Sequence, residues 1–326
     1  MKKLLLIILS MVMSLVVTSP WVSAWNINET CEANVLNKDW QDKSTYVTSG
    51  IYTYRVINEE SKEIEIRDIN SSSKVIKIPK KIDGYNVVSI GYCEDVYSYF
   101  VKLYPDYEEN LYSARLIEDA TDIDALKLGG CQNTLKKLVI PGSVRNIGPC
   151  AFYGFKSLTE VVLNKNLKVM QGKCFGGCSS LKKINIPANT AIGESAFVGC
   201  KSIKEISINQ NNVRYCEELF DRGSFDVVRL KGISYFDNTM FGYGTKIKKL
   251  VIDGNVRKFH LDKWHVKELV VKNKKTEIIC DTADESITDK YNKFKVTSVK
   301  KAKAIKFARK NKLKYHVVKR NYINKM

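Results

Sequence analysis

The chain has 326 residues, of which 44% are hydrophobic and 27% are charged, and its formal net charge is +18. This length suits one elongated repeat domain or two compact domains. The chain has nine cysteines. A chain of this length is not expected to depend on disulfides for its fold, as small secreted domains do.

Residues 1–24 have the pattern of a secretory signal peptide. A basic start, Met1-Lys2-Lys3, precedes the uncharged and largely apolar run Leu4–Val17, and Val22-Ser23-Ala24 is a small-residue cleavage site. The apolar run is too short for a typical membrane span, and no later run is long and apolar enough to cross a bilayer. We therefore expect a cleaved, exported chain without a transmembrane segment, either secreted or held at the cell surface.

Residues 25–73 are expected to form an N-terminal segment and a hairpin cap. Ile51–Val56 and Glu63–Arg67 alternate apolar and polar residues, and Asn58–Ser61 supplies polar turn residues between them. Repeat proteins need a cap over their first repeat, so we expect the hairpin to cover it.

Residues 74–93 are the first predicted repeat, and residues 94–133 are an insertion after it. The repeat contains Val75-Ile-Lys-Ile-Pro79 and the pair Ile90-Gly91. The insertion carries nine acidic and three basic residues. Its apolar residues are spaced for one or two amphipathic helices that break near Pro105. Insertions in solenoids lie on one face, often the binding face.

Residues 134–282 contain the most regular pattern. Hexapeptides with apolar residues at positions one, four and six recur at spacings of 23, 23 and 22 residues. They begin at Leu135, Leu158, Leu181 and Ile203. A phenylalanine recurs in the same register, at Phe152, Phe175 and Phe197. This length and opening are typical of leucine-rich repeats, so the openings should form one parallel sheet of a solenoid with the phenylalanines stacked behind it.

The pattern loosens after Ile208. Val227–Leu230 is a weak further opening, whereas Ile247–Ile252 and Val266–Val271 are clear ones, 19 residues apart. These shorter repeats still supply a strand but leave less room for the other side of each coil.

At these residues a family becomes recognisable. Leu135–Leu158, which runs Leu-Lys-Lys-Leu-Val-Ile-Pro through Ile-Gly and Ala-Phe to Ser-Leu, resembles the BspA-like leucine-rich repeats of secreted and surface proteins. Residues 74–91 are similar to the usual first repeat of that family. The resemblance implies no catalytic activity, and it implies host, matrix or neighbouring-cell proteins as partners.

Residues 283–326 are expected to form a basic C-terminal cap. Lys290–Met326 contains fourteen Lys or Arg residues and no acid. Val299–Asn311 has the apolar spacing of a helix, and the residues expected to face inward are Ala302, Ile305 and Ala308. A closing strand should follow, from the alternation of Leu313, Tyr315 and Val317. A lysine-rich helix and strand of this kind resembles the C-terminal cap of the family. The predicted fold is therefore an α/β repeat solenoid, with a leucine-rich-repeat parallel sheet, an N-terminal β-hairpin cap, a helical insertion and a C-terminal helix–strand cap.

Two columns of outward-facing residues should run along the sheet. Residues at position three alternate in charge, and opposite charges on neighbouring strands would stabilise the register. These are Lys137, Glu160, Lys183 and Glu205. Position two is nearly all lysine, and we expect no acid in this column. The candidate ligand-binding residues are Lys136, Lys182, Lys204, Lys248 and Lys267. This lysine stripe is either a solvated face or a surface that attracts an anionic partner.

The cysteines suggest one candidate disulfide and no metal site. Cys93 and Cys131 flank the insertion, and a bridge between them would be worth roughly 3–4 kcal/mol on the chain-entropy model. Cys178 and Cys200 occupy the same repeat position, where we expect small buried thiols, with a bridge between adjacent repeats as the alternative. Cys174 and Cys178 lack a second pair at ligand spacing, so no metal ion is expected.

The sequence contains no nucleophile elbow, no H-E-x-x-H, no glycine-rich phosphate loop and no Cys-His signature. We therefore expect no enzyme and no cofactor. The predicted function is exported, non-catalytic adhesion or protein binding. The first alternative is binding of a polyanion, such as an acidic glycan or an envelope polymer, through the lysine stripe and the basic tail. The second is a hydrolase or inhibitor with a site in residues 94–133. Export argues against a genomic nucleic acid partner.

Overall fold

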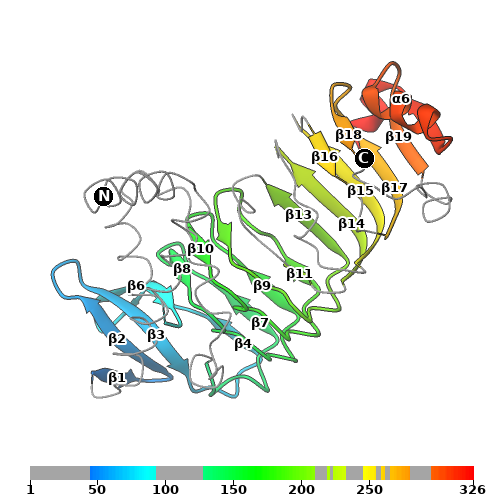
Figure 1. Cartoon of the computed structure of the whole chain (residues 1–326). Coiled ribbons are helices and arrows are strands. Elements are labelled where there is room, and N and C mark those ends of the chain that lie inside the picture. Colours follow the sequence, from blue (N-terminus) through cyan, green and yellow to red (C-terminus); the bar gives the residue numbers. More distant parts are fainter. Residues whose placement is uncertain are drawn as a thin grey trace, which may run out of the picture.

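The chain coils as an elongated, curved solenoid whose short strands follow one another from the N-terminal to the C-terminal end (Figure 1). This computed structural model describes residues 45–92, 128–209, 219–220, 223–232, 245–254, 258–260, 265–279 and 295–326. The predicted signal peptide (1–24) and most of the predicted insertion (94–127) lie outside the described residues, so both stay predictions.

A four-stranded parallel sheet is built from the openings of the first repeats. In spatial order its strands are β4 (Val75–Lys77), β7 (Lys137–Val139), β9 (Glu160–Val162) and β11 (Lys183–Ile184). Glu160 pairs with Lys137 on one side and with Lys183 on the other, which confirms the parallel sheet predicted for these openings. Val75 pairs with Lys137, so the first repeat lies directly beside the repeat that follows the insertion.

A second sheet, which the sequence did not predict, contains the Ile-Gly segments. Its path is β1 (Tyr46–Ser49), β2 (Tyr52–Asn58), β3 (Glu63–Ile69), β6 (Tyr85–Ile90), β8 (Asn146–Ile147), β10 (Val169–Met170) and β12 (Ala191–Ile192), and β5 (Lys81–Ile82) pairs with β6. The glycine of each pair lets adjacent coils approach closely. A Cβ on Gly148, for example, would lie 2.5 Å from the carbonyl oxygen of Tyr92.

The predicted hairpin is present at the N-terminal end of the second sheet. β2 and β3 are antiparallel, and β3 pairs in parallel with β6 of the first repeat. The Asp68 carboxylate accepts hydrogen bonds from the backbone N–H groups of Gly129 and Gly130, at 2.9 and 3.1 Å. Asp68 thereby holds the returning end of the insertion against the hairpin.

The C-terminal half of the solenoid is a six-stranded parallel sheet. Its strands are β13 (Glu205–Asn209), β14 (Ser224–Lys231), β15 (Lys246–Asp253), β17 (His265–Val271), β19 (Lys295–Val299) and β20 (Lys314–Val318). The weak opening at Val227 is confirmed as part of β14, which pairs with β13 and β15. A separate parallel pair consists of β16 (Lys258–His260) and β18 (Glu277–Ile279).

Helices of the described residues occur only near the C-terminus, as α6 (Lys303–Lys310) and α7 (Arg320–Ile323). The described repeats therefore form a parallel β-solenoid, and the predicted α/β class is not confirmed. The physical reason is that the described connections between openings are used by turns and by two-residue strands, which leave no room for a helix.

The C-terminal elements agree only in part with the expectation. The helix begins at Lys303 and buries Ile305 and Ala308 as predicted. The strand β20 exists, but Tyr315 and Val317 are 44% and 39% exposed. β20 is the last strand of its sheet. Leu313, the residue before this strand, is buried in the core, whereas most residues of the strand itself are exposed to solvent.

The predicted aromatic stack is confirmed and is longer than expected. Phe152 stacks on Phe175 with ring centroids 5.2 Å apart, and Phe175 stacks on Phe197 at 5.9 Å. Phe220 continues the stack at 5.4 Å from Phe197. Because each coil contributes one ring, the stack ties successive repeats into one continuous core.

Candidate binding surface

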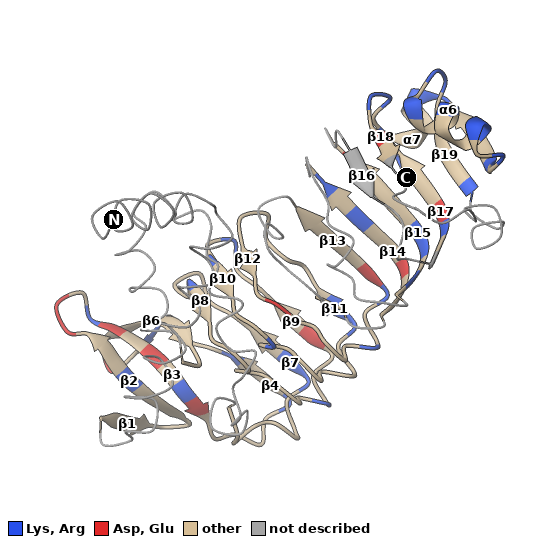
Figure 2. Ribbon diagram, in the orientation of Figure 1, with Lys and Arg blue, Asp and Glu red and all other residues tan. Residues whose placement is uncertain are grey.

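The openings place positions three and five on the outer face of each sheet and position two at its rim, because side chains alternate along a strand. The predicted charged column at position three is present in part, because Val227 of β14 occupies this position between Glu205 and Lys249. Lys137 forms an ion pair with Glu160 at 3.1 Å, and Lys249 lies 3.8 Å from Glu268. Figure 2 shows the alternation of basic and acidic residues across β7, β9 and β11.

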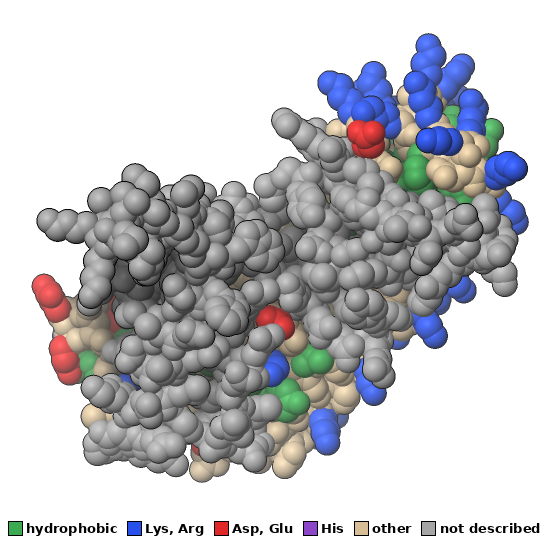
Figure 3. Space-filling model, viewed as in Figure 1, with side chains coloured by type: hydrophobic (Ala, Val, Ile, Leu, Met, Phe, Trp, Pro, Cys, Tyr) green, Lys and Arg blue, Asp and Glu red, His purple; other side chains and the backbone are tan. Residues whose placement is uncertain are grey.

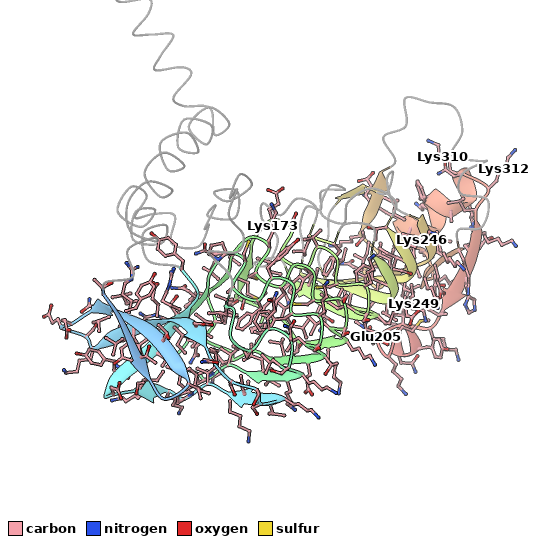
Figure 4. All side chains as sticks on the ribbon, turned by 90° about the horizontal axis from the view of Figure 1, so that it is seen from below. Lys173, Glu205, Lys246, Lys249, Lys310 and Lys312 are labelled. Atoms are coloured by element: carbon pink, nitrogen blue, oxygen red, sulfur yellow. The ribbon has the colours of Figure 1, made fainter. Side chains whose placement is uncertain are left out.

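The charged column changes partners at the boundary between the two sheets. β11 ends the four-stranded sheet and β13 begins the six-stranded one. Glu205 of β13 pairs with Arg229 at position five of the next strand, at 3.1 Å. The view from below in Figure 4 shows Glu205 and Lys249 on the same side of the solenoid, with Lys173 on the other side.

Glu268 is the most enclosed acid of this column. Partial burial would raise its pKa, but the hydrogen bond from Thr297 (2.8 Å) and the charges of Lys295 and Lys249 outweigh burial and lower it. The carboxylate therefore stays ionised between two lysines, and it stabilises three neighbouring strands of the six-stranded sheet.

The five candidate lysines are all exposed along one rim, so the structure brings them into one column. The column begins one repeat earlier than predicted, because Lys74 is exposed and pairs through its carbonyl with Lys136. The backbone hydrogen bonds continue from Lys136 to Thr159 and from Thr159 to Lys182.

The expectation that this column contains no acid is wrong. Asp226 occupies position two of β14, where it bonds to the backbone of Lys204 and forms an ion pair with Lys248 at 2.7 Å. The hydrogen bond from Lys248 lowers the pKa of Asp226. The sequence signal was Phe225-Asp-Val-Val-Arg-Leu230, in which phenylalanine takes the place of the first leucine. The column is thus neutralised at Lys248, while Lys74, Lys136 and Lys182 precede the acid.

A second surface is the basic C-terminal region. Figure 2 shows Lys and Arg residues concentrated around α6, at the end of the molecule, and Figure 3 shows their side chains at the surface there. Lys303 is paired with Glu277 at 3.3 Å. The other exposed basic residues of this region are Lys300, Lys301, Lys306, Arg309, Lys310, Lys312, Lys314, Lys319, Arg320 and Lys325. Figure 4 shows Lys310 and Lys312 projecting outward.

The cysteines of the repeats are buried thiols, as expected. Cys178 and Cys200 are free, and their Sγ atoms donate to the carbonyls of Phe152 and Phe175 in the preceding coil, each at 3.1 Å. Cys131 is a buried free cysteine, and burial raises its pKa to about 12.

Cys93 lies outside the described residues, so its predicted bridge to Cys131 stays a prediction. Among the residues that the structure describes, His, Cys, Asp and Glu side chains form no group of three that could hold a metal ion. In the same part of the chain, no helix has the length and apolar character needed to span a membrane.

A comparison with protein families agrees with the repeat geometry. Residues 121–248 match the model of the BspA-type leucine-rich repeat region, in six copies. These repeats therefore belong to the BspA-type leucine-rich repeat family. A comparison with curated proteins finds no match.

Several solved structures match this chain. A leucine-rich cell surface protein from Faecalibacterium prausnitzii is 17% identical, with a TM-score of 0.45, and the alignment covers 79% of this chain but only 55% of that protein. A leucine-rich repeat protein from T. pallidum is 16% identical, with a TM-score of 0.43, over 83% of this chain and 97% of that one. The pneumococcal vaccine antigen PcpA is 12% identical, with a TM-score of 0.37, over 84% and 98%.

Proposed function

We propose that this protein is an exported, non-catalytic recognition protein that binds a protein partner at the cell surface or outside the cell. The observation that carries the proposal is the exposed lysine column on the N-terminal half of the solenoid. From Lys74 to Lys204 the described column contains no acid, and the first acid is Asp226. Membership of the repeats in the BspA-type family supports binding rather than catalysis, and the signal-peptide pattern of residues 1–24 supports export.

A column of like charge raises the local concentration of an anionic partner and speeds its association. The solenoid fixes the spacing of the lysines, because each lies on a neighbouring coil. The partner we expect is therefore a host, matrix or neighbouring-cell protein with an acidic surface.

The test compares two triple variants of equal net charge. Lys136→Glu, Lys182→Glu and Lys204→Glu reverse the column, whereas Lys306→Glu, Lys310→Glu and Lys312→Glu reverse exposed charges of the C-terminal region. Both proteins are measured against immobilised collagen, fibronectin and heparin at low and at physiological salt. We expect the column variant to lose about tenfold in affinity for a protein ligand at low salt while the C-terminal variant keeps it. Unchanged affinity of the column variant would remove the proposal.

A second candidate function, polyanion binding, is favoured by the exposed basic residues around α6 (Figure 3). It predicts the opposite outcome, in which the C-terminal variant loses heparin binding and the column variant keeps most of it. Binding of this kind should also fall steeply with salt, because the polyanion releases counterions when lysines neutralise it.

A further inference from the structure

The outer faces of the two sheets carry the same feature, a pair of valines at position five on neighbouring strands. Val139 of β7 pairs in register with Val162 of β9. Val251 of β15 pairs in the same way with Val270 of β17. Position five points away from the main core, so each pair is an apolar spot on an otherwise polar face.

The chain covers the second of these pairs with its own C-terminus. Val251 and Val270 are fully buried and form a separate small core with Ile323 of α7, which is also fully buried. Partly buried apolar residues surround this core; they are Val227, Val299, Val318 and Met326.

The cover is fastened by polar contacts at its edge. Lys272, which directly follows β17, donates a hydrogen bond to the Asp253 carboxylate at 3.0 Å and another to the carbonyl of Asn324, just after α7, at 3.4 Å. A valine pair on this face can therefore be covered by a short helical turn that carries one branched aliphatic residue and is held by a lysine at the rim.

The first pair is open at Val162, whereas Val139 is half-buried. Val162 is 39% exposed, and Val75, diagonal to Val139 on the neighbouring strand, is 48% exposed. Figure 3 shows hydrophobic atoms at the surface beside lysine and acidic side chains in this part of the molecule.

The surroundings of the open pair are basic. Lys74, Lys77 and Lys136 are exposed next to it, and on the described strands of this sheet the one acid of the outer face, Glu160, is already paired with Lys137. A segment that covers these valines would thus meet uncompensated positive charge.

We infer that Val139 and Val162, with Val75 beside them, are the anchor site of the protein partner, and that they accept an acidic segment with one branched aliphatic residue, seated as Ile323 is seated on Val251 and Val270. This inference rests on the proposed function, because it names the chemistry of the partner that the lysine column attracts. A second copy of the chain fits poorly, because its covering segment carries Lys319, Arg320 and Lys325 and would be repelled.

The experiment uses a synthetic peptide of residues 319–326 in which Lys319, Arg320 and Lys325 are replaced by glutamate. Valine methyl resonances of the full chain are followed by NMR as the peptide is added. We expect the methyl groups of Val139 and Val162 to shift, and we expect Val162→Ser to weaken the peptide about fivefold. The control Val317→Ser removes an exposed valine from β20 and should leave the affinity unchanged.

Two further peptides separate the outcomes. A glutamate peptide with serine in place of Ile323 should bind at least about fivefold more weakly. If it binds equally well, the valine pair is not an anchor site, although charge recognition by the lysine column survives. If the unaltered basic peptide binds the pair more tightly than the glutamate peptide, a second copy is the occupant and the acidic partner is excluded. Absence of any shift at Val139 and Val162 overturns the inference. The proposed function fails by a different result, an unchanged affinity of the variant with Lys136→Glu, Lys182→Glu and Lys204→Glu for its protein ligand.

Discussion

The two halves of the solenoid solve the same packing problem with different means. In the N-terminal half, openings of two or three residues alternate with the Ile-Gly strands of a second sheet, so each coil is fixed at two places. In the C-terminal half, strands of up to eight residues form one broad sheet. Short strands make few hydrogen bonds, so the N-terminal half depends more on close contact between coils and on the stacked phenylalanines.

The outer faces of the two halves differ in which apolar and charged residues they leave exposed. The C-terminal half buries its valine pair under α7 and neutralises its lysine column at Asp226. The N-terminal half leaves Val162 and the lysines of its column exposed, and its Val139 is half-buried. The same repeat therefore serves to close the molecule at one end and to present a surface at the other.

The largest effect that would sharpen this comparison is expected from Gly193→Ala in the second sheet. A Cβ at Gly193 would overlap the backbone of Gly172 and lie 2.6 Å from the carbonyl carbon of Gln171. Since backbone on an adjacent coil cannot move aside locally, we expect a loss of about 3 kcal/mol in the free energy of unfolding. Urea unfolding followed by circular dichroism measures it.

The matched control is Gly142→Ala in a turn of the same half. Its Cβ would have only the Asn166 side chain near it, at 3.8 Å, so its stability should change by less than about 0.5 kcal/mol. Equal stability of the two variants would show that the close approach of the coils does not limit the N-terminal half.

The next effect concerns the cover of the C-terminal half. Ile323→Ala removes the side chain that covers Val251 and Val270, and it should lower the free energy of unfolding by about 2 kcal/mol. This value is at the lower end for a buried isoleucine, because a four-residue helix at a chain end can loosen. Hydrogen exchange in β15 and β17 should rise with it. Tyr322→Ala is the neighbouring control, since Tyr322 is 56% exposed; a similar loss there would argue against Ile323 as the anchor.

Much of the fold could be predicted because the same apolar pattern recurs in one register in several repeats. Phe152, Phe175 and Phe197 recur with the openings, and their stacking follows from that spacing alone. The second sheet could not be predicted in the same way. Its strands in the regular repeats, such as Asn146–Ile147, have two residues, too few to show any periodicity.

The candidate surface was predicted less completely. The position of Lys136 and its equivalents follows from counting within each opening. Asp226 was missed because Phe225 replaces the leucine that marks position one. The burial of Val251 and Val270 depends on Ile323, more than fifty residues away in the chain, and local patterning carries no information about such a contact.

The smallest effect is the acid dependence of stability that Glu268 of the charged column produces. The lowered pKa of Glu268 means that the folded state favours the ionised carboxylate more than the unfolded chain does. Its contribution is present above the ordinary pKa of a glutamate and is lost as the pH falls through the lowered value. Glu268→Gln should therefore flatten the decline of stability with acid, by less than about 1 kcal/mol in total.

Urea midpoints measured at several pH values between neutral and about 3 test this expectation, since the titration of a glutamate lies in that range. The comparison is Glu160→Gln in the N-terminal half, where the carboxylate is 34% exposed and has Lys137 as its ion-pair partner, against 20% exposure and two lysines for Glu268. Water screens the more exposed pair, so at neutral pH Glu160→Gln should lower the free energy of unfolding less than Glu268→Gln does. An equal change in both variants would mean that the charged column stabilises the two halves alike, and that the halves differ only in their valine pairs and in the acid of the lysine column.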